Sequence, residues 1–219
     1  MTLPLRIAHR GMPRRLPENS LPSFAAALDE GADGIELDVH ASSDGVVVVH
    51  HDPTLGGMEI ARTAWAALRA VEVAPGVHAP TLLEVCDLVR ARAELFVEIK
   101  GAGIEIRVAE VLSGYAGPAA IHSFDHALIG RLAHRGVPRR LGLLYDELPS
   151  HLTGAMRECG ALDVWPDRRL VTQALIEDVH AAGGRVIPWT VNDASEARRF
   201  ASWAVDGLCT DDVTLLPRS

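Results

Sequence analysis

Cysteine is scarce in this sequence. Its 219 residues include only three cysteines, Cys86, Cys159 and Cys209, which lie far apart and form no C-x-x-C pair. An odd number of cysteines without paired spacing predicts neither a disulfide framework nor a structural zinc site. We therefore expect three reduced thiols, most of them buried.

Long apolar stretches are also missing. No run of about eighteen apolar residues occurs without a charge, which is what a membrane-spanning helix would need. Residues 1–6 lack the basic and apolar regions of a secretory signal. Aromatic residues make up only 5% of the chain, which leaves little material for a membrane-interface surface. The sequence therefore predicts a cytoplasmic protein with no stable membrane insertion.

Basic residues are outnumbered by acidic ones. There are 21 Lys and Arg against 29 Asp and Glu, which gives a formal net charge of −8. Because nucleic-acid phosphates are bound by clustered Lys and Arg, we expect no nucleic-acid partner.

Hydrophobic residues form 48% of the chain and charged residues 23%, a balance that favours a large core over disorder. We predict one compact domain over residues 1–219, either an enzyme or a binding domain.

Strand-like and helix-like segments alternate along the chain. If residues 46–51 are a hairpin excursion after the second strand, eight strands remain, centred on Ile7, Ile35, Val97, Ile121, Leu143, Val164, Ile187 and Leu208. The strand around Ile187 is expected to cover residues 185–191. Eight strands that alternate with helices predict a (β/α)8 TIM-type barrel, and an open doubly wound sheet is the alternative.

The helical segments carry recognisable start signals. Thr81 is the expected N-cap of one helix, and Glu84 three residues later predicts a capping box. Residues 54–80 are expected to be irregular apart from a short helix near residues 63–70. The other predicted helices cover residues 21–28, 82–89, 104–112, 126–134, 148–159, 172–182 and 194–203.

Two acidic residues share one face of the second predicted strand. Glu36 and Asp38 alternate with apolar residues in the segment from Gly34 to Val39, so both carboxylates point away from the apolar face. A turn signal at residues 43–45 and a β-branched run then bring His51 back toward these acids. Taken alone, the pattern is also compatible with a half-buried hairpin that carries solvated acids.

A third carboxylate is expected at the same place. Glu98 and Lys100 share a face of the next barrel strand, and the carboxyl ends of all strands meet at one mouth of a barrel. Alone, this pair is compatible with a strand-end salt bridge. Three carboxylates in one mouth would repel one another, however, and an all-oxygen set favours a hard ion. We therefore predict one divalent cation, Mg²⁺ or Ca²⁺, on Glu36, Asp38 and Glu98.

Two histidines and two cations complete the predicted site. His9 ends the first strand and His51 ends the return run, and imidazole both takes up and releases protons near neutral pH. Arg10 and Lys100 add fixed positive charge, which suits a phosphoryl oxygen whose charge builds in a transition state. The pattern therefore indicates phosphoester cleavage. His50 faces away from His51 and is interpreted as a core or rim histidine.

Seven motifs, in this order, resemble those of the glycerophosphodiester phosphodiesterase family. They are His9-Arg10-Gly11, Pro17-Glu18-Asn19-Ser20, Gly34-Ile35-Glu36-Leu37-Asp38-Val39, His51-Asp52-Pro53-Thr54-Leu55, Val97-Glu98-Ile99-Lys100, Ser123-Phe124-Asp125 and Trp189-Thr190-Val191-Asn192. Each motif is weak by itself, but the order and spacing match almost end to end. The resemblance implies a TIM-type barrel of the phospholipase C-like phosphodiesterase type.

The resemblance also implies roles for single residues. It implies one divalent metal on Glu36, Asp38 and Glu98, and a general acid/base pair at His9 and His51. It further implies that the phosphate contacts Arg10 and Lys100, and that Trp189 lines a glycerol pocket. The implied substrate is a small glycerophosphodiester, hydrolysed to sn-glycerol 3-phosphate and an alcohol such as choline or ethanolamine.

Two departures from the family pattern are visible. Ser20 stands where threonine is commoner, which is a small change. The segment after Leu55 is shorter than usual and lacks a D-R-T-T-like continuation, which affects the wall expected near the leaving alcohol.

Two other classes of function share parts of this pattern. A phospholipase D-like enzyme acting on lysophospholipids uses a similar metal and histidine pair, but it needs an apolar or basic surface at the membrane. The composition does not favour such a surface. A metal-binding scaffold without turnover would leave His9, His51 and Arg10 without a role. Hydrolysis of glycerophosphodiesters is therefore the prediction.

Overall fold

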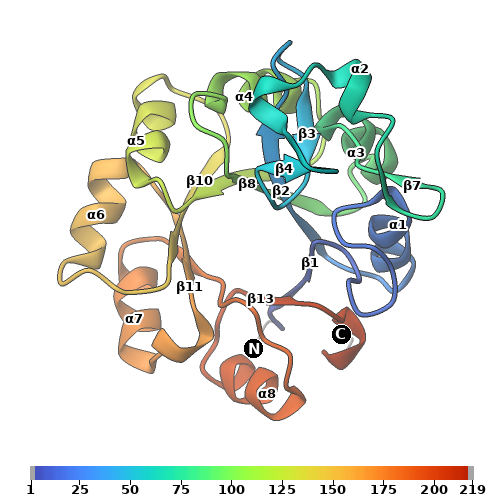
Figure 1. The fold of residues 1–219 in the computed structure, drawn as a ribbon. Coiled ribbons are helices and arrows are strands. Elements are labelled where there is room, and N and C mark those ends of the chain that lie inside the picture. Colours follow the sequence, from blue (N-terminus) through green and yellow to red (C-terminus); the bar gives the residue numbers. More distant parts are fainter. Residues whose placement is uncertain (1–2, 217–219) are drawn as a thin grey trace.

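The strands of the protein form a nearly closed barrel ringed by helices (Figure 1), in a computed structural model that describes residues 3–216. The strands neighbour one another in the order β12-β11-β10-β9-β8-β2-β1-β13, and a short strand, Val47–Val49 (β3), pairs with β2 off this path. Every neighbouring pair along the path is parallel. The eight barrel strands are Leu5–His9 (β1), Gly34–Ala41 (β2), Glu94–Ile99 (β8), Ala119–Ser123 (β9), Arg140–Tyr145 (β10), Asp163–Pro166 (β11), Arg185–Val186 (β12) and Gly207–Thr210 (β13).

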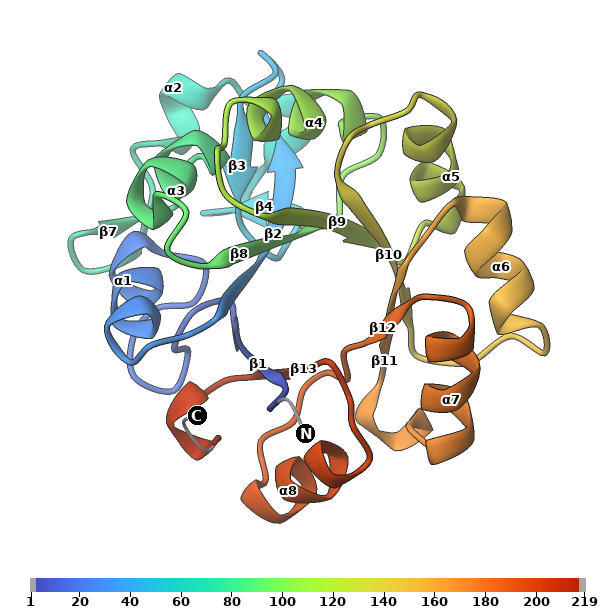
Figure 2. The same ribbon diagram turned by 180° about the vertical axis from the view of Figure 1, so that it is seen from behind.

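The predicted barrel is confirmed, and the open-sheet alternative is wrong. In an open doubly wound sheet the first and last strands do not meet, whereas here β1 pairs with β13 from Leu5↔Gly207 to Ala8↔Thr210. Figure 2 shows the same ring from behind, with β1 and β13 side by side near the two labelled ends of the chain.

The barrel is completed at β12, which is shorter than predicted. Strand pairing covers only Arg185–Val186, because Pro188 has no backbone N–H to continue a regular ladder. Separate backbone hydrogen bonds join this segment to β13. The N–H of Cys209 donates to the carbonyl of Pro188 at 3.1 Å, and the N–H of Val191 donates to the carbonyl of Cys209 at 2.8 Å.

The helices cover the outside of the barrel. They are Leu21–Asp29 (α1), Trp65–Leu68 (α2), Leu82–Val89 (α3), Glu105–Ser113 (α4), His126–His134 (α5), Leu152–Cys159 (α6), Gln173–Ala181 (α7) and Ala194–Ser202 (α8), with short 3-10 turns at Ile60–Arg62 (η1), Arg168–Leu170 (η2) and Val213–Leu215 (η3). Across residues 3–216, none of these helices has the length and apolar character needed to cross a bilayer.

The helix signals in the sequence are mostly confirmed. The Thr81 hydroxyl accepts from the N–H of Glu84 at 3.2 Å, and the Glu84 carboxylate accepts from the N–H of Thr81 at 2.7 Å, which completes the predicted capping box. The start of α6 was predicted four residues too early, at Leu148 instead of Leu152. Pro149 explains the difference, since a proline disfavours helical geometry at the residue before it.

The excursion between β2 and β8 is more ordered than predicted. After Val47–Val49 (β3), the chain forms two small hairpins, Thr54–Leu55 (β4) with Met58–Glu59 (β5) and Glu72–Ala74 (β6) with Val77–His78 (β7). Of these strands, β7 lies beside α1 and α3 at the outer edge of the molecule (Figure 1). The excursion has its own apolar cluster, formed by Val48, Leu55, Ile60, Leu68 and Ala79. The expectation of an irregular segment is therefore wrong, although the short helix α2 is confirmed.

Two apolar cores hold the barrel. The larger one lies between the strands and the surrounding helices. The smaller one fills the interior with Ile7, Phe96, Ala120, Leu144, Trp165, Ile187 and Cys209. At the start of the strands, the buried Asp163 pairs with Arg140 at 2.9 Å and with Arg185 at 2.7 Å. Side chains therefore fill the interior near the amino-terminal ends of the strands, and a cavity opens toward their carboxyl ends.

Candidate active site

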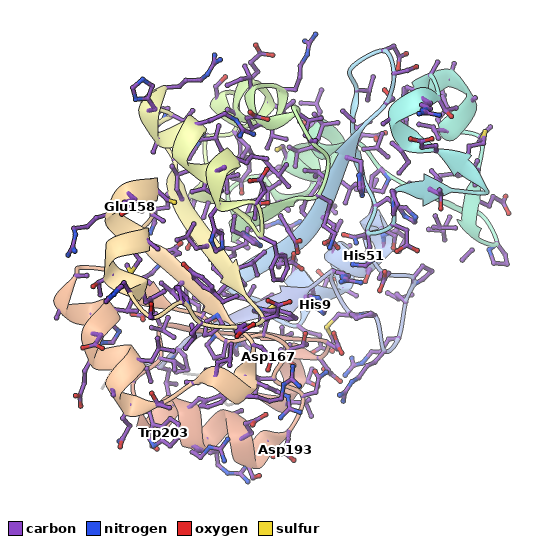
Figure 3. The ribbon with its side chains drawn as sticks, turned by 60° about the vertical axis from the view of Figure 1, so that its left-hand side comes forward. His9, His51, Glu158, Asp167, Asp193 and Trp203 are labelled. Atoms are coloured by element: carbon purple, nitrogen blue, oxygen red, sulfur yellow. The ribbon has the colours of Figure 1, made fainter. Side chains whose placement is uncertain are left out.

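A cavity of about 340 Å³ opens at the carboxyl ends of the barrel strands. It is lined by His9, Arg10, Glu36, His51, Glu98, Lys100, His122, Phe124, Leu144, Trp165, Trp189, Thr190 and Cys209. The labelled His9 and His51 lie on the blue, N-terminal side of the barrel in Figure 3. All the predicted site residues except Asp38 therefore line one cavity, and Asp38 is fully buried beside two of them, Arg10 and Lys100.

Strand register brings the acidic residues together. Parallel pairing sets Asp38 beside Glu98 in β2 and β8, and Glu36 lies two residues earlier on the same face. Donor atoms of Glu36, Glu98 and His122 lie within 4.8 Å of one another. Burial, together with the charges of Asp38 and Glu36, raises the pKa of Glu98 to about 7. This crowding of carboxyl groups is what the sequence predicts for a cation site.

Asp38 is held differently from the other two acids. Its Oδ2 accepts from the Asn19 amide at 2.9 Å and lies 3.0 Å from Nε of Arg10. Burial favours its neutral form, but the positive charges of Arg10 and Lys100 and the Asn19 hydrogen bond lower the pKa of Asp38. Its Oδ1 is buried and accepts no hydrogen bond from any residue in the range 3–216. Asp38 is thus an ionised carboxylate whose Oδ1 accepts no hydrogen bond within residues 3–216 but lies 3.8 Å from Nζ of Lys100.

His9 is oriented by a carboxylate from the last strand. Its Nδ1 lies 2.7 Å from Oδ1 of Asp211. Because an ionised carboxylate only accepts, Nδ1 carries a proton and donates it to Asp211. Asn192 fixes Asp211 in turn, donating to Oδ2 at 2.6 Å and accepting from the Asp211 N–H at 3.0 Å. Burial lowers the pKa of His9, but Asp211 and Glu36 outweigh it and leave this pKa raised.

His51 is oriented by a carboxylate that is more exposed than the one beside His9. Its Nδ1 lies 2.8 Å from Oδ1 of Asp52, and its Nε2 lies 3.1 Å from Nζ of Lys100. The Lys100 ammonium only donates, so Nε2 of His51 accepts and Nδ1 holds the proton. The Asp52 side chain is 67% exposed, against 25% for Asp211. The cavity is lined by His51 and not by His50, as strand alternation predicts.

The two cations sit among the acids. Arg10 follows β1 with a positive φ of 54°, and its Nη1 lies 3.2 Å from Oε1 of Glu18. Nζ of Lys100 lies 3.2 Å from Oε1 of Glu98. The salt bridge that the sequence allows for Glu98 and Lys100 is therefore present, but inside the cavity rather than at a solvated strand end.

Aromatic side chains form much of the remaining cavity wall. Trp189 meets Phe124 edge to face with ring centroids 5.7 Å apart, and its Nε1 donates to the carbonyl of Trp165 at 3.0 Å. In the part of the chain that the structure describes, no residue of the 54–80 excursion lines the cavity. Ser123, another polar residue at a strand end, is also absent from the lining. Its hydroxyl donates to the carbonyl of Ile99 at 2.8 Å.

Sequence reasoning missed three residues of this site. Asp211 reaches His9, 202 residues away along the chain, only because the barrel closes between β13 and β1, and Asn192 in turn holds Asp211. His122 was not recognised as a site residue, although it lies in the predicted strand that ends at Ser123. A usable signal existed, since polar residues near the carboxyl ends of barrel strands commonly face the mouth.

The fold and this constellation define a class of hydrolase that acts on phosphodiesters. A model of the glycerophosphoryl diester phosphodiesterase family matches residues 9–215. The chain therefore belongs to this family, and the resemblance found in the seven motifs is confirmed.

Individual relatives agree with this assignment. A glycerophosphodiester phosphodiesterase of Caldanaerobacter subterraneus is 31% identical over 231 residues, covering 95% of this chain and 94% of the relative. A phosphodiesterase of Oleispira antarctica, solved in complex with the product sn-glycerol-3-phosphate, is 26% identical with a TM-score of 0.89, covering 95% and 93% of the two chains. A glycerophosphodiester phosphodiesterase of Thermotoga maritima is 26% identical with a TM-score of 0.84, covering 98% of both chains.

Proposed function

We propose that this chain hydrolyses glycerophosphodiesters to sn-glycerol 3-phosphate and an alcohol. The observation that carries the proposal is the meeting of His9 and His51 with Glu36 and Glu98 in one cavity. The Oleispira antarctica relative, which holds sn-glycerol-3-phosphate as product, supports the same product here. We further propose water-soluble substrates in the cytoplasm, because little of the chain is aromatic and the acidic residues outnumber the basic ones.

His9 and His51 are the proposed acid/base pair. In each ring Nδ1 is tied to a carboxylate at 2.7 or 2.8 Å, which makes Nε2 the nitrogen for proton transfer. In His51 this nitrogen accepts from Nζ of Lys100 at 3.1 Å before substrate binds. One ring accepts the proton of the attacking hydroxyl, and the other gives a proton to the oxygen of the leaving alcohol. The carboxylates keep both rings oriented while their protonation changes.

Arg10, Lys100 and Trp189 are the proposed substrate contacts. Arg10 and Lys100 line the cavity, 3.0 and 3.8 Å from the Asp38 carboxylate, and these two basic side chains can contact phosphoryl oxygens. Trp189 and Phe124 offer apolar faces to the glycerol carbons. Charge on one wall and aromatic surface on the other suit a polar diester with a short carbon chain.

Glu36, Asp38 and Glu98 are the proposed ligands of one divalent cation. The residues fit this role in two ways. The Asp38 Oδ1 is buried among the described residues without a hydrogen bond, and burial, together with the charges of Asp38 and Glu36, raises the pKa of Glu98 to about 7. An oxygen-rich set of this kind favours Mg²⁺ or Ca²⁺. When bound, the cation supplies positive charge that polarises a phosphoryl oxygen.

One assay tests the substrate class. Release of sn-glycerol 3-phosphate is measured from a panel of glycerophosphodiesters, and head-group release is measured separately from lysophospholipids. We expect turnover of the first set only. Turnover of lysophospholipids alone would replace the proposal with the phospholipase D-like function.

A matched pair of variants ties that activity to the cavity. We expect His9→Gln to lower turnover by about 10²-fold or more, because it removes a positioned acid or base. His180→Gln is the control, since His180 also pairs with a carboxylate, Asp206 at 2.9 Å, but lies on the outer helix α7. Equal loss of activity in both variants would show that the activity does not come from this cavity.

A further inference from the structure

His122 is a buried histidine that the proposed chemistry does not use. It lies in β9 with 1% of its surface exposed, and it borders the cavity. Its Nδ1 is buried without any hydrogen-bond partner among residues 3–216. A buried histidine that serves only the core normally has its ring nitrogens hydrogen-bonded, because an unpaired polar atom in the interior is destabilising.

The position of the imidazole is well determined. Strand register sets Asp38 beside Glu98 and Glu98 beside His122, so three adjacent strands carry these side chains at one level of the barrel. The ring stacks on Trp165 with centroids 4.4 Å apart and an interplanar angle of 9°. This stacking fixes the plane of the ring without occupying either nitrogen.

The spacing of the donor atoms suits an ion better than a hydrogen bond. Nε2 of His122 lies 3.9 Å from Oε1 of Glu36, too far for a hydrogen bond. Donor atoms of Glu36, Glu98 and His122 nevertheless all lie within 4.8 Å of one another. Donors that bind one ion at about 2.1 to 2.4 Å are at most about 4.2 to 4.8 Å apart, so the three atoms can share one ion.

We propose that His122 is a nitrogen ligand of the divalent cation in this cavity, beside Glu36 and Glu98. This inference rests on the proposed metal-dependent function and extends its ligand set from oxygen alone to oxygen and nitrogen. Imidazole favours first-row transition ions, whereas carboxylates alone favour Mg²⁺ and Ca²⁺. The site should therefore bind Mn²⁺ and Co²⁺ more tightly than Mg²⁺.

Spectroscopy on the metal-loaded protein tests the inference without reference to turnover. Purified full-length chain is stripped with chelator and loaded with Mn²⁺, and pulsed electron paramagnetic resonance is used to detect a nitrogen nucleus bound to the ion. We expect a nitrogen signal whose pattern changes when the protein is labelled with [¹⁵N]histidine. This measurement needs no variant, so it stays decisive if a substitution fails to fold.

Variants then identify the histidine. We expect His122→Gln to lose the nitrogen signal and to weaken Mn²⁺ binding by about tenfold or more, while Ca²⁺ binding changes by less than about threefold because the carboxylates remain. His51→Gln is the matched comparison, since its imidazole borders the same cavity, and it should keep the signal. Retention of the signal in His122→Gln, or its loss in His51→Gln, would overturn the assignment.

Different results would overturn the role of His122 and the proposed hydrolase function. Bound Mn²⁺ without any nitrogen signal would overturn the role of His122, while release of sn-glycerol 3-phosphate by the same preparation would leave the proposed function standing. Absence of that release, with a nitrogen signal present, would instead overturn the function and keep the ligand.

Discussion

The raised pKa of Glu98 leads to a quantitative prediction about metal binding. Burial is the largest cause, and the neighbouring Asp38 and Glu36 charges add to it, so the carboxyl holds its proton up to a pKa of about 7. Because a cation binds the ionised form, protons and metal ions compete for Glu98. Lowering the pH should therefore weaken metal binding and increase the number of protons that binding releases.

The size of the effect follows from that pKa. In metal-free protein about nine-tenths of the Glu98 carboxyls are protonated at pH 6, about half at pH 7 and about one-tenth at pH 8. Binding one cation should then release about 0.9, 0.5 and 0.1 protons at these three pH values. The apparent dissociation constant should be about tenfold weaker at pH 6 than at pH 8.

Titration calorimetry measures both quantities. Ca²⁺ is titrated into metal-free protein at each pH in two buffers of different ionisation enthalpy, and the difference in heat gives the number of protons released. Glu98→Gln should bind Ca²⁺ more weakly and release few protons. Glu105→Gln is the control, because Glu105 is also a buried carboxylate but pairs with Arg131 on the outside of the barrel at 2.9 Å. Affinity that is constant from pH 6 to pH 8, with no proton release, would refute the reasoning.

Three further substitutions test other parts of the structure. His51→Ala should reduce kcat by about 10²- to 10⁴-fold in the diester assay, while His50→Ala stays near wild type; similar rates in the two variants would contradict the choice of His51. Asp211→Asn should lower kcat by about 10²-fold or more with little change in KM, because His9 loses the carboxylate that fixes its tautomer. The control is the neighbouring Asp212→Asn, which should keep normal kinetics. Asp163→Asn should reduce the free energy of unfolding by about 3 kcal/mol, because two arginines lose a buried partner, and an unchanged denaturation midpoint would show that this network is not stabilising.

Local patterns in the sequence were sufficient for most single elements. The capping box at Thr81 and the alternation through Glu36 and Asp38 depend on neighbours within a few residues, and the structure reproduces both. The small hairpins of residues 54–80 were missed, although Gly56 and Gly57 at positive φ form the turn between β4 and β5. Strands of two residues are too short to give a visible alternation.

The sequence by itself determined which residues can carry the chemistry, and the tertiary structure decided which of them meet. Motif order and strand count were enough to predict the family, the barrel and seven of the residues that line the cavity, among them His9 and Trp189. Barrel closure was needed to pair His9 with Asp211, and strand register was needed to bring His122 beside Glu98. These contacts join segments that are distant along the chain, and their geometry is fixed by packing of the whole barrel rather than by any local pattern.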